Sequence, residues 1–207
     1  TTPVVGLVVK PNENVSLSAN RIEGLVAGTA VADTADVLNR GQVFPPFQTV
    51  QYELGGKVVV GGVNVSIAGF QSERPNGFYR NLVPPQGIIT REYVIDGLQR
   101  NRGIEFALDG ELTKGLRIIS GAALNDAKLT RSDNPAYVGK KAVGVPDYTV
   151  NANVEWDVVP SFTLTGRMMH TGPQMVNQTN TLELDSWTRF DVGARFVTVL
   201  GGNPVTF

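Results

Sequence analysis

The segment YTVNANVEWDV, residues 148–158, alternates strictly between apolar and polar side chains. Its apolar members are Tyr148, Val150, Ala152, Val154, Trp156 and Val158, and its polar members are Thr149, Asn151, Asn153, Glu155 and Asp157. Successive side chains of a β-strand point to opposite faces, so this period of two predicts a strand with one apolar and one polar face. Val159-Pro160-Ser161 interrupts the pattern before it resumes over residues 162–168, which predicts a hairpin.

The length of this strand helps to distinguish two classes of β-protein. Eleven residues at about 3.3 Å each extend roughly 36 Å, and a tilt of about 45° reduces the height to roughly 25 Å. That height matches the apolar band of an outer-membrane barrel, whereas strands of soluble proteins usually have about 5–6 residues. The hairpin therefore favours a transmembrane strand, with a long hairpin in a soluble β-sandwich as the alternative.

The composition excludes several functional classes. The chain has 207 residues, a net charge of −1 and no cysteine. Disulfides and thiolate metal sites are therefore absent, and the near-neutral charge without a basic stripe argues against a nucleic-acid partner. No run of about 18 apolar residues predicts a transmembrane helix, but barrel strands need no such run because lumen-facing residues interrupt the lipid-facing ones.

The rest of the chain repeats this form. Further strands are predicted over residues 4–9, 15–20, 51–60, 63–67, 101–112, 116–129 and 187–199, with a short last strand at Pro204–Phe207. Tight turns are predicted near residues 12, 61, 114, 160 and 202. Long loops are predicted over residues 24–48, 72–98, 130–147 and 172–186, with one short helical turn at Ala30–Leu38.

Tight turns and long loops thus alternate along the chain. Because alternate connections of an up-and-down sheet lie at opposite ends, all the tight turns should lie on one rim and all the long loops on the other. Outer-membrane barrels sort their connections in this way. The pattern predicts an all-β fold, namely an antiparallel up-and-down transmembrane β-barrel segment of about ten strands. Leu54, Ile104, Val150 and Val154 should face lipid, and Glu53, Glu105, Asn151 and Glu155 the lumen.

Several motifs, in a shared order, resemble the late barrel of TonB-dependent siderophore receptors. They are Lys10-Pro11 with Asn14-Val15-Ser16-Leu17, Tyr52-Glu53-Leu54-Gly55-Gly56-Lys57, Gln99-Arg100-Asn101-Arg102-Gly103-Ile104-Glu105, Asp109-Gly110-Glu111-Leu112-Thr113-Lys114-Gly115-Leu116, Val145-Pro146-Asp147-Tyr148, Thr171-Gly172-Pro173 and Asp191-Val192-Gly193-Ala194-Arg195. The resemblance implies a bacterial outer-membrane receptor that takes up ferric siderophores with energy from the TonB complex. It also implies outer-membrane lipid as surroundings, no cofactor and no enzymatic activity.

The sequence departs from this family pattern in two ways. The family carries an N-terminal plug domain that couples to TonB, and this sequence contains none. The family barrel has 22 strands, and its full-length final strand ends on an aromatic residue. About ten strands are predicted here, and the last of them, Pro204–Phe207, is too short to span a membrane. We therefore expect residues 1–207 to be part of one barrel domain, as an open curved sheet whose edges pair with the remaining strands of the same receptor.

The search for a chemical site gives two candidates for ligand binding. Phe78-Tyr79-Arg80 places two aromatic rings beside a cation on a long loop, which could hold a siderophore by stacking and charge; a loop that packs on itself is the alternative. His170 is the only histidine, and it lies where a predicted strand ends and a long loop begins. It faces either a ligand or solvent at the rim.

No catalytic or metal site is predicted. Because His170 is the only histidine, we expect neither a Ser-His-Asp triad nor a histidine-based metal cluster. Glu105, Asp109 and Glu111 share one strand face and could be read as acid–base groups. Lumen charges paired with arginines of neighbouring strands are the preferred interpretation, and Arg102, Arg117, Arg167, Arg189 and Arg195 are the predicted partners.

Three functions therefore remain to be separated. The preferred one is a barrel segment of a ferric-siderophore receptor. A passive porin-like barrel, whose pore is its function, is the first alternative. A soluble β-sandwich that binds a carbohydrate or a surface is the second.

Overall fold

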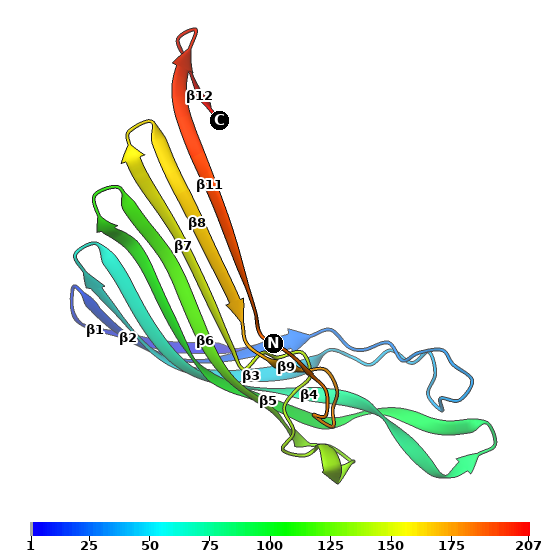
Figure 1. Ribbon diagram of the computed structural model, residues 1–207. Coiled ribbons are helices and arrows are strands. Elements are labelled where there is room, and N and C mark those ends of the chain that lie inside the picture. The colour runs from blue at the N-terminus through cyan, green and yellow to red at the C-terminus, as the bar shows by residue number, and fades with distance from the viewer. Residues whose placement is uncertain (1) are drawn as a thin grey trace.

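The computed structural model describes residues 2–207, which form one curved, open antiparallel sheet (Figure 1). Its ten strands, in spatial order, are β1 (Val4–Asn12), β2 (Val15–Val26), β3 (Phe47–Val60), β4 (Val63–Gln86), β5 (Ile89–Thr113), β6 (Leu116–Arg131), β7 (Tyr148–Val159), β8 (Phe162–Thr171), β11 (Trp187–Leu200) and β12 (Asn203–Thr206). A separate pair, β9 (Gln174–Met175) with β10 (Glu183–Leu184), and a 3-10 helix, η1 (Pro135–Tyr137), lie in the connections. The predicted all-β, antiparallel, ten-stranded and unclosed architecture is confirmed.

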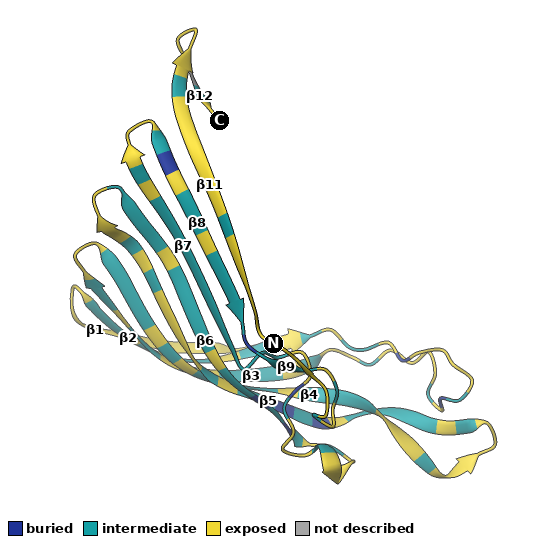
Figure 2. Cartoon of the chain, in the orientation of Figure 1, coloured by how far each residue is buried: buried dark blue, intermediate teal, exposed yellow. Residues whose placement is uncertain are grey.

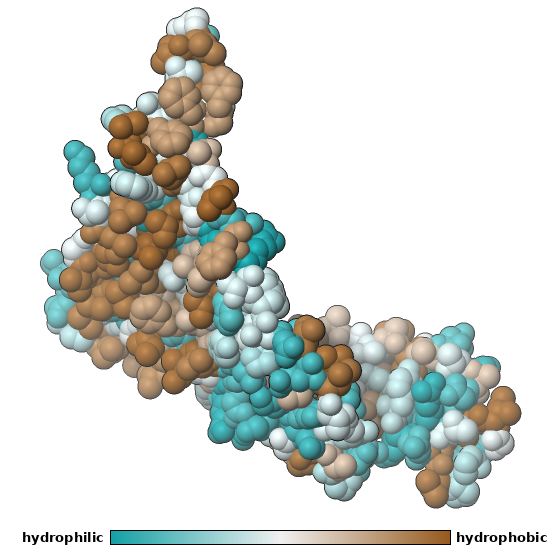
Figure 3. Space-filling model, viewed as in Figure 1, coloured by the Kyte–Doolittle hydropathy of each residue, from teal (hydrophilic) through white to brown (hydrophobic). Residues whose placement is uncertain are grey.

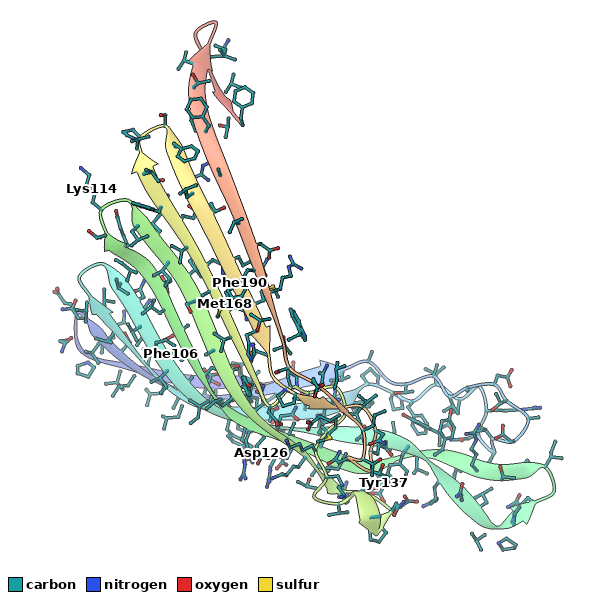
Figure 4. The ribbon with its side chains drawn as sticks, in the orientation of Figure 1. Phe106, Lys114, Asp126, Tyr137, Met168 and Phe190 are labelled. Carbon is teal, nitrogen blue, oxygen red and sulfur yellow. The ribbon has the colours of Figure 1, made fainter. Side chains whose placement is uncertain are left out.

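The tight turns gather on one rim of the sheet and the long connections on the other (Figure 1). The turn between β3 and β4 shows why its sequence suits a tight hairpin. Gly61 and Gly62 have φ values of 57° and 84°, and a two-residue type I′ turn needs positive φ at both positions. Lys114, in the turn between β5 and β6, and Tyr137, in the connection between β6 and β7, lie at opposite ends of the molecule (Figure 4). The predicted up-and-down sorting is confirmed.

The strand register separates an apolar face from a polar one. Residues that lie directly opposite each other on paired strands share a face. One such row across the sheet consists of Leu17, Gly56, Ile67, Phe106, Ala122 and Val150. The neighbouring row on the same face contains Ala19, Leu54, Ile104 and Leu124.

This apolar face is strongly exposed. Leu54 is 69% exposed, Phe190 71% and Val192 92%, and hydrophobic residues cover the visible strand surface (Figure 3). A contiguous apolar surface of this kind marks a membrane or protein contact. The β-sandwich alternative is wrong, because the described chain has no second sheet packed on this face.

The opposite face is polar and concave. A groove of about 600 Å³ follows it, and its lining includes Ser16, Ser18, Glu53, Lys57, Ser66, Glu105, Thr149 and Asn151. The predicted division of the strands is therefore confirmed, with Leu54, Ile104, Val150 and Val154 on one face and their polar neighbours on the other. Ile119 is an exception, because its register with Asp109 and Asn153 places it on the polar face.

Two predictions of local structure are wrong. Residues 72–98 are not a loop, because β4 and β5 continue as a paired ladder as far as Gln86 and Ile89. The prolines in this region suggested a loop, but Pro75 is accommodated opposite Leu98 next to a register shift. Ala30–Leu38 forms no helical turn and instead makes single bridges, including one from Val37 to Arg91.

Few residues are fully buried, because a single-layer sheet has no core between layers. The buried apolar residues of the described chain are Val31, Val37, Ala127, Leu129 and Ala142. They belong to the long connections and to the end of β6 that adjoins them (Figure 2). Among residues 2–207, no helix combines the length and the apolar character needed to cross a membrane.

The sidedness of the connections can be tested with single cysteines, since residues 1–207 contain none. A cysteine at exposed Gln178, in a full-length protein that is otherwise free of cysteine, should react with a membrane-impermeant maleimide on intact cells. A cysteine at exposed Lys114 should react only after the cells are lysed. Labelling of both sites on intact cells would contradict the up-and-down arrangement.

Candidate ligand-binding site

β4 and β5 extend as a two-stranded arm beyond the ends of the neighbouring strands (Figure 1). Cross-strand pairs hold the arm together. Arg80 forms an ion pair with Glu92, its register partner, at 2.8 Å. The rings of Tyr79 and Tyr93, also register partners, meet edge to face with centroids 5.0 Å apart. Phe78-Tyr79-Arg80 therefore lies in a strand rather than on a loop.

The connection between β2 and β3 is bound to this arm by hydrogen bonds and an ion pair. The Asn39 side-chain amide donates to the Tyr93 carbonyl at 2.9 Å, and the Tyr93 amide donates to Asn39 Oδ1 at 3.0 Å. Asp36 forms an ion pair with Arg91 at 2.7 Å, and the next residue, Val37, forms a bridge with Arg91 and is 1% exposed. Two backbone-like hydrogen bonds, an ion pair and a buried side chain make the connection and the arm one unit.

The Asp36 carboxyl, which pairs with Arg91 in this contact, is charged at neutral pH. A hydrogen bond from the Thr34 side chain, together with the Asp36 backbone amide and Arg91, holds the pKa of the Asp36 carboxyl below its usual value. Asp36 is therefore ionised at neutral pH and pairs with Arg91 there.

An aromatic and cationic cluster lies on the arm. The Arg91 guanidinium lies 4.6 Å from the centroid of the Tyr79 ring, a distance at which a cation and a π-face attract. Phe44, from the connection between β2 and β3, packs against Tyr93 with ring centroids 5.8 Å apart. Tyr79 is 38% exposed, so part of the ring is available to a ligand.

A cavity of about 680 Å³ joins this cluster to two other connections. We call it the arm pocket, and its lining includes Phe78, Tyr79, Arg80, Tyr93, Asn134, Tyr137 and Gln178. It combines aromatic surface, the Arg80 guanidinium, the Asp133 carboxylate and neutral amide groups at the loop end of the sheet. Sites for small ligands commonly combine apolar lining with a few placed polar groups.

A second asparagine organises the far wall of the arm pocket. Lys141 donates its amide hydrogen to Asn180 Oδ1 at 2.7 Å, and Asn180 Nδ2 donates to the Lys141 carbonyl at 3.1 Å. Asn180 has a φ of 55°, a left-handed conformation that asparagine tolerates better than most residues. This contact ties the connection after β8, which carries Gln178, to the connection after β6.

The structure does not bring His170 to the arm pocket. Its register with Val150 places it on the apolar face near the end of β8. There its ring stacks on Tyr148 at 5.4 Å, and Nδ1 lies 2.7 Å from the Thr188 hydroxyl. No contact within the described chain connects it to Phe78, Tyr79 or Arg80, and its role in ligand binding stays a prediction.

The lumen charges pair differently from the prediction. Arg117 contacts Asp157 at 2.7 Å and Glu155 at 3.2 Å on the polar face. Arg102 is not a lumen charge as predicted, because its register places it with Asp126, 2.8 Å away, on the face that carries Ile104. The predicted acidic partners Glu105, Asp109 and Glu111 form no ion pair in the described part of the chain. Asp109 accepts a hydrogen bond from Asn64, and Glu111 accepts one from the Gly115 amide. The prediction chose partners by face but could not know the register.

Sequence reasoning missed several residues of the site. Tyr93 and Arg91 lie in a segment predicted as loop, and Asn39 and Tyr137 lie in connections without periodicity. The strand-forming run Tyr93-Val94-Ile95 was an available signal, and the nearby prolines obscured it. Within residues 2–207, no group of three or more histidine, cysteine, aspartate or glutamate residues is arranged to hold a metal ion.

Comparison with known proteins gives a consistent picture. Residues 1–203 match the family model described as TonB dependent receptor-like, beta-barrel. The ferrichrome receptor FcuA of Yersinia enterocolitica is 37% identical over 211 residues, which cover 100% of this chain and 27% of that receptor.

Two solved structures extend the comparison. The ferric preacinetobactin receptor BauA from Acinetobacter baumannii superposes with a TM-score of 0.81 at 34% identity, over 99% of this chain and 30% of that one. The siderophore receptor PiuA from the same species superposes with a TM-score of 0.76 at 21% identity, over 94% of this chain and 29% of that one, and supports the fold alone. The chain thus spans less than a third of the length of these relatives.

Proposed function

This chain belongs to the TonB dependent receptor-like β-barrel family of bacterial outer-membrane proteins, and from that premise we propose that it is part of a receptor that imports ferric siderophores. The observation that carries the proposal is the match of residues 1–203 to this family together with the 37% identity to a ferrichrome receptor. Uptake would be energised by the TonB complex. Residues 1–207 would contribute a run of neighbouring strands to one barrel domain.

The arm pocket is the part of the chain that we propose contacts the siderophore. Tyr79 and Phe78 offer aromatic surface for the planar ligand groups, and Arg80 offers positive charge to an anionic complex. Arg80 is already paired with Glu92, so it would hold the ligand with its remaining donors. Phe78, Tyr79 and Arg80 thus keep their proposed role, and His170 is left out because of its position.

Uptake of radiolabelled iron tests the function. Cells that lack their own siderophore receptors should take up ferrichrome-bound or preacinetobactin-bound iron when they express the full-length receptor and TonB. Deletion of TonB should abolish that uptake. Uptake that persists without TonB, together with single-channel conductance of the purified receptor, would instead favour the passive pore.

Replacement of Tyr79 by alanine tests the arm pocket. Loss of the ring contacts should raise the half-saturating siderophore concentration roughly 3- to 10-fold, since an aromatic contact contributes about 0.5–1.5 kcal/mol. Tyr79→Phe keeps the ring and should bind nearly as the native receptor does. Equal affinity of the native and alanine receptors would exclude Tyr79 from the site without affecting the assignment of the receptor.

A further inference from the structure

The connection between β2 and β3, residues 27–46, acts as a third strand of the arm. β4 and β5 extend beyond the neighbouring strands, and the connection runs away from the sheet beside them (Figure 1). An isolated pair of strands is only marginally stable in water, whereas a further strand or a packed face stabilises it. The arm therefore needs a partner along the outer edge of β5, and the connection is that partner.

The connection pairs with the backbone of Arg91 and Tyr93 on this edge. The Arg91 amide donates to the Asp36 carbonyl at 3.2 Å, and the Arg91 carbonyl accepts from the Leu38 amide at 2.8 Å. At Tyr93 the Asn39 side chain replaces a peptide group: Oδ1 accepts from the Tyr93 amide at 3.0 Å, and Nδ2 donates to the Tyr93 carbonyl at 2.9 Å. Asn39 thus extends the ladder by one step with its side chain.

The two residues held in this way are the two that support the Tyr79 ring. The Tyr93 ring meets the Tyr79 ring edge to face with centroids 5.0 Å apart, and the Arg91 guanidinium lies 4.6 Å from the Tyr79 centroid. Asp36 pairs with the same guanidinium at 2.7 Å, and Phe44 packs against Tyr93 with centroids 5.8 Å apart. The connection therefore holds both the backbone and the side chains of these supports.

The connection does not itself line the arm pocket. Within residues 2–207, the lining comes from the arm and from the connections after β6 and β8, and no residue of 27–46 belongs to it. The connection is anchored behind the pocket by Val37, which is buried against the arm. A residue such as Asn39, which holds the pocket wall from outside, can change ligand affinity only through the position of that wall.

We propose that Asn39 is a positioning residue for siderophore binding, and that the connection forms the Tyr79–Tyr93 wall of the arm pocket before a ligand arrives. The proposal rests on the function proposed above for this pocket. A ligand that meets a formed wall does not have to order it, and a site that is formed only part of the time binds more weakly in proportion. Without the Asn39 side chain, the Tyr93 backbone loses both partners on this edge.

Uptake of ferrichrome-bound or preacinetobactin-bound iron by the full-length receptor with Asn39→Ala tests the positioning role. The half-saturating concentration should rise roughly 3- to 10-fold, because two hydrogen bonds to Tyr93 are lost. The maximal uptake per receptor at the cell surface should not change. A lower number of surface receptors with an unchanged half-saturating concentration would mean a merely structural role and would overturn the proposal.

Two further variants separate positioning from direct contact with the ligand. If Asn39 acts through the wall, Asn39→Ala should have little additional effect in a receptor that already carries Tyr79→Ala. Asn125→Ala is the matched control, because Asn125 also bonds a connection through its side chain, to the Pro146 carbonyl at 3.1 Å, but does not line the arm pocket. A full additional loss in the double variant, or an equal rise for Asn125→Ala, would overturn the proposal.

Hydrogen exchange of the purified receptor, read by mass spectrometry, tests the pre-formed wall without a ligand. The Tyr93 amide of the native receptor should be protected before and after the siderophore is added, and in Asn39→Ala it should exchange at least about tenfold faster in the free receptor. Rapid exchange of this amide in the free native receptor would overturn the proposal. A native receptor that takes up neither iron complex but protects the Tyr93 amide would contradict the proposed function and leave the pre-formed wall supported.

Discussion

Replacement of Val150 by arginine is expected to destabilise the folded receptor by about 2–3 kcal/mol, whereas the same replacement at neighbouring Asn151 should cost much less. Val150 shares a row with Phe106 and Ala122 on the apolar face, one row from the middle of the membrane-spanning part of β7. An arginine there must hold its charge in hydrocarbon or extend toward the headgroups. Asn151 lines the polar groove on the opposite face. Its register partner on β6, Gly121, has no side chain, so the longer arginine side chain has room in the groove.

The pair Val150→Arg and Asn151→Arg is a matched test, because the two positions are adjacent and receive the same side chain. Guanidinium-induced unfolding of the full-length receptor in phospholipid vesicles gives the two free energies of unfolding. A loss at Asn151 as large as the loss at Val150 would show that the two faces have been assigned the wrong way round.

Most of the sheet could be predicted because its information is local. Period-two alternation in residues 148–158 and the Gly61-Gly62 turn each follow from one short stretch, and neither depends on distant partners. The arm could not be predicted in this way. Its strand character depends on cross-strand pairs such as Arg80 with Glu92, which become visible only when the register is known.

The candidate site was predicted in part for the same reason. Phe78, Tyr79 and Arg80 were found from their chemistry, and all three line the arm pocket. Asn39 and Asn180 were not found, because an asparagine that hydrogen-bonds to a distant backbone looks like any other loop asparagine in the local sequence. His170 was placed correctly at the end of its strand, but the face that it occupies follows from its register with Val150.

A valine in place of Gly103 is expected to destabilise the sheet by about 1–3 kcal/mol, since it forces extra volume between closely spaced strands. A Cβ at this position would lie 2.2 Å from the Leu124 carbonyl oxygen and 2.9 Å from the Phe70 ring. The ring can turn, but the carbonyl belongs to β6, so the two strands must separate locally and weaken their ladder. Gly166→Val, in β8, is the matched control: a Cβ there meets nothing within 4 Å, and the change should be neutral or slightly stabilising. Denaturant midpoints of both variants in the full-length receptor provide the comparison, and equal midpoints would show that the close approach at Gly103 does not limit the packing of β5 against β6.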